Sequence, residues 1–409
     1  MWGNPQYDSI QNLSSQASES IKDDLSLNKA SLLELPLAAG PLVSLSVSGG
    51  ELFVASKEYV LWGDYRDVSR EGSKHPGSGN VPSTWKRVRL DKEPVGYRNT
   101  ILRDGDDLHV LAKGGRHQIS VSSAQVTAFS SGPVVEQVLA FGESQSVEVD
   151  AQNSRIRVPG PEQKKLEVRS KSGQMAIGWS DGLALVAGNE AYLMTGRGEV
   201  RDMCPGYSID RALRLIHPIH LPDHLISDGD APDYLLLGGM DGNSIMLTTF
   251  CTKKATVVDV KKIALDPSGR NSVLCGLAVV YGKIVAVVND GQRYQWVTTT
   301  WEPTQPYETV SPIVSINAKR NDPVSIVMMP REEGAFAVIL GPQDETQSKI
   351  NFYRLGDDDM MWKPLAGASR SVRGLPIAVG YADGRLFVGC NRQDQGKSQG
   401  VVYVYEVEV

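Results

Sequence analysis

Short apolar segments separated by tight turns recur along almost the whole chain. At the C-terminal end, the turn Ala382-Asp383-Gly384 precedes an apolar segment at 385–390, and a polar connection leads to a second segment at 401–409. The second segment alternates apolar and polar residues with a period of two, as in a strand with one buried face. About six similar units lie upstream, with Asp-Gly or Gly-Gly where hairpin turns need a positive φ.

Each unit is a small sheet with too little core to be stable alone. Packing such sheets side by side around an axis buries both faces of each of them. The sequence therefore predicts an all-β fold, a β-propeller covering residues 35–409. We count seven blades, and six or eight remain open because 137–169 could be part of a blade or an insertion. A pair of β-sandwiches is the competing architecture.

Residues 1–34 form a separate N-terminal segment rich in Ser, Gln, Asn, Asp and Lys. Ile10, Leu13, Ala17 and Ile21 follow spacings of three, four and four, which predicts a short amphipathic helix. A polar, disordered tail is the alternative. If the helix forms, its apolar edge is expected to contact the body of the protein or another subunit.

Composition and cysteine use limit the compartment and the partners. The net charge of -6 argues against nucleic acid or an anionic membrane as the main partner. The start of the chain has no signal-peptide pattern, and the apolar window 277–288 is too short to span a bilayer. We therefore expect no membrane insertion. An intracellular location, in the cytoplasm or nucleus, is favoured by four widely spaced cysteines without a C-x-x-C pair: Cys204, Cys251, Cys275 and Cys390.

Three segments, 59–64, 349–355 and 401–407, resemble the third strand of WD40-type blades, with an aromatic residue where the Trp of Trp-Asp falls. The chain contains neither a Gly-His nor a Trp-Asp dipeptide, so the hydrogen-bonded tetrad of ordinary WD blades is not assigned. The chain resembles a degenerate WD40-like β-propeller. This resemblance implies the fold and leaves the function open.

A second resemblance concerns segment 78–85, Ser-Gly-Asn-Val-Pro-Ser-Thr-Trp, which is similar to the sialidase-type Asp box. Asn80 stands in place of the Asp and Pro82 in place of the Gly. In that family the box is a structural turn between two strands of a blade, with its aromatic residue packed beneath. The resemblance implies a propeller and raises an alternative function, a lectin-like carbohydrate-binding or sialidase-like glycan-processing protein.

Three histidines, His217, His220 and His224, cluster within a strand-poor insertion at 203–232. Imidazoles at such spacing could ligate zinc. Because Pro218 and Pro222 break any helix that would align them, we interpret them as exposed loop residues and expect no metal. Long loops on a rigid body often bind partners.

Arg293, Tyr294, Trp296 and Trp301 form a cationic and aromatic group. We expect Trp296 in the core and Trp301 at the surface, where it could stack on a sugar or clamp a peptide together with Arg293. The chain has no Gly-rich phosphate loop, G-x-S-x-G or H-E-x-x-H motif. No catalytic or cofactor-binding residue is predicted, although acids converging in a central channel are left open.

Together these patterns predict a non-enzymatic scaffold, a subunit of a larger intracellular assembly whose partners are other protein subunits. A glycan ligand is the alternative. The residues predicted to contact partners are Ile10, Leu13, Ile21, His217, His220, His224, Arg293 and Trp301.

Overall fold

The computed structural model describes residues 26–27, 30–68, 78–96, 100–132, 134–140, 143–150, 155–158, 164–167, 174–179, 182–187, 190–195, 199–203, 205–215, 234–265, 272–280, 283–289, 294–301, 308–313, 325–331, 334–342, 346–355, 362–365, 369–394 and 396–408. These residues form 34 strands and two short 3-10 helices, η1 (Leu37–Ala39) and η2 (Tyr65–Asp67). No helix in this part of the chain has the length and apolar character that a bilayer span requires.

The described strands form eight antiparallel sheets in which neighbours in sequence are neighbours in the sheet. The first sheet contains β3 (Leu42–Ser48), β4 (Glu51–Ser56), β5 (Tyr59–Asp64) and β6 (Lys86–Arg89). The second contains β7 (Ile101–Asp104), β8 (Asp107–Ala112), β9 (Gly115–Ser120) and β10 (Gln125–Ser131). The third contains β11 (Val134–Ala140), β12 (Glu143–Asp150), β13 (Arg155–Val158) and β14 (Lys164–Glu167). The fourth contains β15 (Gln174–Trp179), β16 (Gly182–Ala187), β17 (Glu190–Thr195) and β18 (Val200–Asp202).

The second half of the chain repeats this arrangement. The fifth sheet contains β19 (Ser208–Leu215), β20 (Tyr234–Asp241), β21 (Ser244–Cys251) and β22 (Thr256–Ala264). The sixth contains β23 (Val273–Val280), β24 (Lys283–Asn289), β25 (Tyr294–Thr300) and β26 (Glu308–Ile313). The seventh contains β27 (Ser325–Arg331), β28 (Gly334–Pro342), β29 (Gln347–Leu355), β30 (Trp362–Pro364) and β31 (Arg370–Arg373). The eighth contains β32 (Leu375–Ala382), β33 (Arg385–Asp394) and β34 (Lys397–Glu408), with β1 (Ser26–Leu27) and β2 (Ser31–Glu34) on β34.

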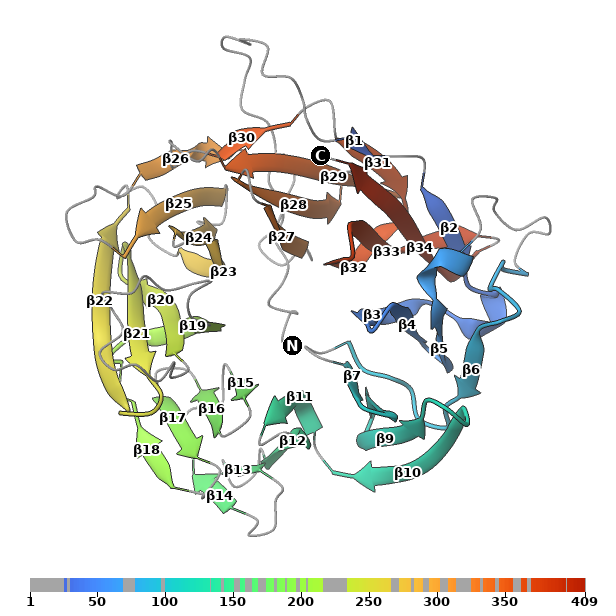
Figure 1. The fold of residues 1–409 in the computed structure, drawn as a ribbon, viewed down its shortest axis with the longest axis horizontal. Helices are drawn as coiled ribbons and strands as arrows, with labels where there is room; N and C mark the ends of the chain where they lie inside the picture. Colours follow the sequence, from blue (N-terminus) through green and yellow to red (C-terminus); the bar gives the residue numbers. More distant parts are fainter. Residues whose placement is uncertain are drawn as a thin grey trace.

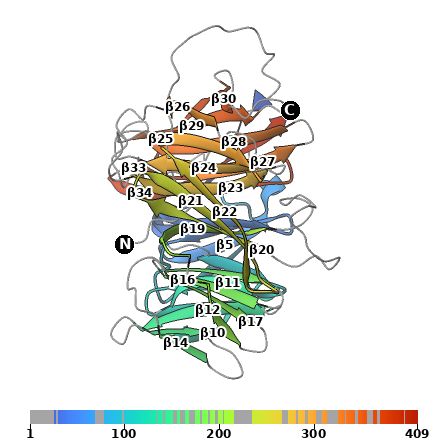
Figure 2. The ribbon, with the colours of Figure 1, turned by 90° about the vertical axis from the view of Figure 1, so that its left-hand side faces the viewer.

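The sheets are arranged around a central axis, with the first strand of each sheet innermost (Figure 1). Each inner strand contacts the inner strand of the next sheet, and β32 contacts β3, so the ring is closed. Figure 2 shows the ring from its side, with outer strands such as β22 running obliquely across the rim. The predicted β-propeller is confirmed by this arrangement.

The described strands form eight sheets, one more than the seven blades that we favoured. Eight blades lie within the range of six to eight that the sequence left open. The extra sheet is β11–β14, whose strands overlap the segment 137–169. Charged residues alternate through β13 (RIRV) and occupy most of β14 (KKLE), so these short strands show little of the apolar pattern used for counting.

Hairpin turns between the strands use the expected residue types. Asp383 and Gly384, which join β32 to β33, both have positive φ, at 50° and 75°. Two consecutive residues with positive φ are typical of the type I′ turn, which matches the right-handed twist of the flanking strands. The Asp-Gly dipeptide therefore fixes the register between β32 and β33, in which Ala382 pairs with Arg385 and Tyr381 with Leu386.

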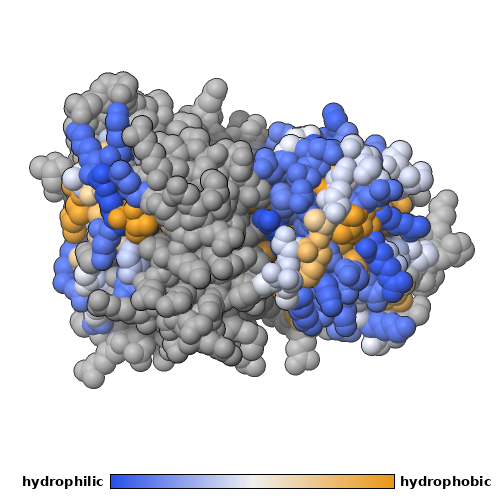
Figure 3. Space-filling view, turned by 90° about the horizontal axis from the view of Figure 1, so that it is seen from below, coloured by the Kyte–Doolittle hydropathy of each residue, from blue (hydrophilic) through white to orange (hydrophobic). Residues whose placement is uncertain are grey.

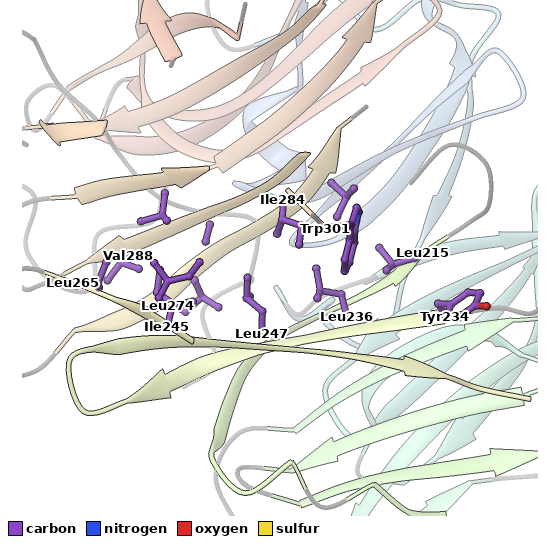
Figure 4. Close-up of a cluster of buried hydrophobic side chains, with 14 of the residues drawn as sticks. Leu215, Tyr234, Leu236, Ile245, Leu247, Leu265, Leu274, Ile284, Val288 and Trp301 are labelled. Atoms are coloured by element: carbon purple, nitrogen blue, oxygen red, sulfur yellow. The ribbon is translucent and has the colours of Figure 1, made fainter. Parts of the chain in front are cut away.

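Apolar side chains fill the spaces between neighbouring sheets. The cluster between the fifth and sixth sheets includes Leu215, Leu236, Ile284 and Trp301, which lie close together in Figure 4. Trp301 follows β25 and is only 3% exposed. The expectation of a surface-exposed Trp301 is therefore wrong: its indole fills the space between two sheets, where burial of an aromatic ring is most favourable.

The N-terminal strand β2 closes the ring by pairing with β34. Its adjacent leucines point to opposite faces, as successive residues of a strand do. Leu32 packs against the cluster shared with Ile350 of the seventh sheet, and Leu33 belongs to the cluster that contains Leu52 of the first sheet. Ser31–Glu34 therefore belongs to the last sheet, although the sequence placed it in the N-terminal segment. The predicted helix with Ile10, Leu13 and Ile21 lies outside the described residues.

Candidate functional site

Asn80 covers the outer edge of the closing strand β2. Its Nδ2 donates to the Leu32 carbonyl at 2.6 Å, its Oδ1 accepts from the Glu34 N–H at 2.6 Å, and its own N–H donates to the Glu34 carbonyl at 2.9 Å. Gly79, with φ of +74°, permits this approach, because a Cβ there would lie 2.6 Å from the Glu34 carbonyl oxygen. Asn80 thus replaces a neighbouring strand at this edge.

The segment that resembles an Asp box therefore has a structural role at the ring closure. It lies between β5 and β6, and Trp85 at its end is 7% exposed, with its Nε1–H donating to the Asp64 carbonyl at 3.2 Å. Trp85 belongs to the apolar cluster that contains Leu33 and Leu52, while Asn80 bonds to β2.

Charged and amide side chains join β2 to the β33–β34 hairpin. Arg392 Nη2 lies 2.5 Å from the carboxylate of Glu34, which is 5% exposed. The same guanidinium donates through Nε and Nη2 to Oε1 of Gln399, and Gln399 Nε2 donates to the Leu35 carbonyl at 2.6 Å. Asn391 bonds to both the N–H and the carbonyl of Leu42 on the first sheet. Buried charges are stable only when paired and hydrogen-bonded in this way.

A cavity of about 470 Å³ lies beside this network, and we name it the Arg373 pocket. It opens between the seventh and eighth sheets, at the ends of β31 and β33. It is lined by Thr346, Gln347, Arg373, Gly374, Leu375, Asn391, Arg392 and Gln393. The described lining residues include two arginines and no carboxylate, so this described part of the lining is cationic.

A second cavity, of about 270 Å³, lies between the first and eighth sheets, and we name it the Tyr65 pocket. It is lined by Ser31, Tyr65, Arg66, Val68, Arg385, Val404 and Glu406. The Tyr65 hydroxyl donates to Asp383 at 2.8 Å, and the guanidinium of Arg385 lies 5.1 Å from the centre of the Tyr65 ring. Burial and the hydrogen bond to Asp383 raise the pKa of Tyr65, so its hydroxyl remains a donor at neutral pH.

The two pockets lie on opposite faces of the ring. Arg385 at the start of β33 lines the Tyr65 pocket, and Arg392 near its end lines the Arg373 pocket. The two arginines are seven positions apart along the strand, a span of about 23 Å. Figure 3 shows another part of the rim, on the side of the second to fourth sheets, where the coloured residues are mostly hydrophilic and hydrophobic residues form small patches.

Two buried histidines lie in the second sheet. His117 on β9 is 0% exposed, packs its ring 4.7 Å from that of Phe129, and has its Nε2 3.6 Å from Oδ1 of Asp91. His109 on β8 is 6% exposed. Burial lowers the pKa of both histidines, because charging an imidazole in an apolar environment is unfavourable. These residues are parts of the core and lie away from both pockets.

The structure leaves most of the predicted contact residues untested. His217, His220, His224 and Arg293 lie outside the described residues, as do Ile10, Leu13 and Ile21. Trp301 is the one predicted contact residue that is described, and it is buried. Within the described ranges, no group of three or more His, Cys, Asp or Glu side chains is placed to hold a metal ion.

Sequence reasoning did not identify Glu34, Asn80, Arg373 or Arg392. Glu34 and Asn80 are 46 residues apart, and Glu34 and Arg392 are separated by nearly the whole chain. Gly79-Asn80 gave a partial indication in the sequence. Glycine often adopts a positive φ in a turn, and the asparagine amide often forms hydrogen bonds to backbone groups. The pairing partner itself depends on how the ring closes.

No family model matches the chain, and no curated protein matches its sequence. Similar solved structures include the N-terminal domain of Nup159, with 10% identity, a TM-score of 0.48, and coverage of 98% of this chain and 100% of that one. An S. cerevisiae complex of Dbp5 with Nup159, Gle1, IP6 and ADP contains a match with 10% identity, a TM-score of 0.47, and coverage of 97% and 100%. Kluyveromyces lactis Hsv2 matches with 10% identity, a TM-score of 0.46, and coverage of 80% and 98%.

These likenesses are distant, and the fold rests on the strands and their pairing in this chain. Successive four-stranded meanders surround an axis, and an N-terminal strand completes the last sheet. The described part of the chain is a β-propeller.

Proposed function

We propose that the protein is a non-enzymatic scaffold that binds other protein subunits within an intracellular assembly, in the cytoplasm or nucleus. The observation that carries this proposal is the composition of the two pockets beside the ring closure. Arg373 and Arg392 line one, and Tyr65, Arg66 and Arg385 line the other. Arginine and tyrosine are enriched among the residues that dominate protein–protein binding.

The ring closure supports this role because it makes the pockets rigid. Glu34, Arg392 and Gln399 are joined by hydrogen bonds, and the latter two lie on paired strands. A surface that is ordered before binding loses less entropy on association. Loops and strand ends on such a body are common positions for partner contacts.

The glycan-binding alternative came from the resemblance of segment 78–85 to an Asp box, with an exposed Trp301 as the candidate ring for stacking on a sugar. Because Trp301 is buried between two sheets, its ring is not accessible for stacking on a sugar. No other described residue gives this alternative specific support, and we favour protein partners.

The proposal is tested by isolating the full-length protein from its own cells under gentle conditions. We expect it to elute well above its own mass of 44.5 kDa, with partner proteins in fixed stoichiometry. The purified recombinant chain provides the size standard for the uncomplexed protein. Elution of the cellular protein at this same size, without stoichiometric partners, would contradict the scaffold role.

A further inference from the structure

The Arg373 pocket has directed hydrogen-bond donors that no described residue uses. Arg373 is exposed, and its guanidinium has no acidic partner in the described part of the chain. Arg392 uses Nε and Nη2 for Glu34 and Gln399, while none of the described residues accepts from its Nη1. Glu34 balances the charge of Arg392, so the described lining of the pocket retains about one positive charge, from Arg373.

The positions of these groups are fixed by the surrounding backbone. Gly374 adopts φ of +112°, its N–H donates to the Thr346 carbonyl at 2.7 Å, and its carbonyl accepts from the buried Ser348 hydroxyl at 2.5 Å. The Arg373 carbonyl also accepts a hydrogen bond from the Tyr403 hydroxyl at 3.0 Å. The backbone of Arg373 is therefore held in place while its side chain extends to solvent.

An apolar group lies next to these donors. Leu375 lines the same pocket and is 42% exposed, one of five large hydrophobic residues that are at least 40% exposed among the described residues. A free phosphate would use the arginines and leave Leu375 in water. A peptide carrying a carboxylate beside an apolar side chain would use both.

We propose that the Arg373 pocket binds an acidic segment of a partner protein, with a carboxylate against Arg373 and Arg392 and a neighbouring apolar side chain against Leu375. The planar guanidinium matches a carboxylate in geometry and charge. The volume of about 470 Å³ accommodates two or three side chains. This inference rests on the proposed scaffold function and names the chemistry of one partner.

The test uses the full chain and a fluorescein-labelled peptide of alternating glutamate and leucine, with a lysine–leucine peptide as its counterpart. Fluorescence anisotropy is measured over a titration into the millimolar range. We expect binding of the glutamate peptide only, and Arg373→Glu should weaken it by at least about tenfold, as loss of a charge-assisted bond does. Leu375→Ser should weaken it to a smaller extent.

Arg87→Glu provides the matched control, because Arg87 is exposed on β6 of the first sheet and the substitution changes the net charge equally. We expect the Arg87→Glu protein to bind the glutamate peptide with the affinity of the unmodified protein. Thermal midpoints should show that all variants are folded. Equal effects of Arg373→Glu and Arg87→Glu, or binding of both peptides alike, would overturn the inference. Displacement of the peptide by equimolar inorganic phosphate would assign the pocket to phosphate and overturn it as well.

Purification from cells separates this inference from the scaffold function. If Arg373→Glu loses one partner that Arg87→Glu retains, both proposals are supported. If both variants retain every partner, the pocket inference fails and the scaffold function stands. If the unmodified protein has no partner at all, the scaffold function fails.

Discussion

Single polar residues determine how this ring closes. Asn80 satisfies three backbone groups on the outer edge of β2, and Arg392 neutralises the buried carboxylate of Glu34. Hydrogen bonds of this kind contribute modestly when they are made and cost more when one partner is removed. Their main effect is therefore to fix one register for β2.

Replacing Asn80 by alanine should destabilise the protein. The change leaves the Leu32 carbonyl and the Glu34 N–H without their side-chain partner, at a cost of about 1–3 kcal/mol for each group that water does not reach. We expect a lower thermal midpoint by calorimetry. Gln125→Ala, at an exposed position on β10, should leave the midpoint unchanged; similar midpoints for both variants would show that Asn80 does not secure β2.

His117 should make stability depend on pH. Burial holds its pKa in the folded state below the ordinary value of 6.5, so the unfolded chain binds a proton that the folded chain excludes. Stability is therefore constant above pH 6.5 and falls as the pH decreases below it, by up to about 1.4 kcal/mol per pH unit for each such histidine. His109 contributes in the same direction.

The measurement is the free energy of unfolding in urea between pH 7 and about pH 5. Most carboxylates titrate below this range, so they contribute little to the slope. His117→Leu should reduce the slope, and a double change with His109→Leu should reduce it further. An unchanged slope in both variants would mean that these imidazoles remain accessible to protons in the folded state.

At the scale of elements, the sequence predicted the strands with clear alternation and the turns with Asp-Gly. The pairing of β33 with β34 and the turn at Asp383-Gly384 follow from local pattern. The closing strand β2 was missed because Ser-Leu-Leu-Glu does not alternate: it lies between two sheets and buries a leucine on each side. Trp301 was misplaced for a related reason, because its burial depends on a neighbouring sheet rather than on adjacent residues.

The boundary of the N-terminal segment can be tested by two truncations. Removing residues 1–25 should leave the thermal midpoint of the propeller unchanged, because β2 stays intact. Removing residues 1–34 deletes β2, exposes the outer edge of β34 and should lower the midpoint strongly. Equal midpoints for the two truncated proteins would contradict a structural role for Ser31–Glu34.

At the scale of the molecule, eight thin sheets are stabilised by their neighbours around one ring. The propeller was predictable because turn chemistry and alternation recur in most units. The number of sheets was less certain because β13 and β14 have few apolar residues, and the pockets were not predictable because they join residues from distant parts of the chain. The proposed function depends on this closed form, since both pockets border the sheet that β2 completes.

The register of that closure is directly measurable. Leu32 on β2 is paired with Tyr403 on β34. The Leu32 carbonyl points away from β34 and accepts from Asn80, so Leu32 and Tyr403 form a non-hydrogen-bonded pair of the antiparallel ladder. Side chains in such pairs approach closely enough for a disulfide. Mild oxidation of the double variant Leu32→Cys with Tyr403→Cys should give a nearly complete cross-link by mass spectrometry. The control pair Leu32→Cys with Val126→Cys, on the distant strand β10, should give none; equal cross-linking of the two pairs, or none in either, would contradict closure of the ring by β2.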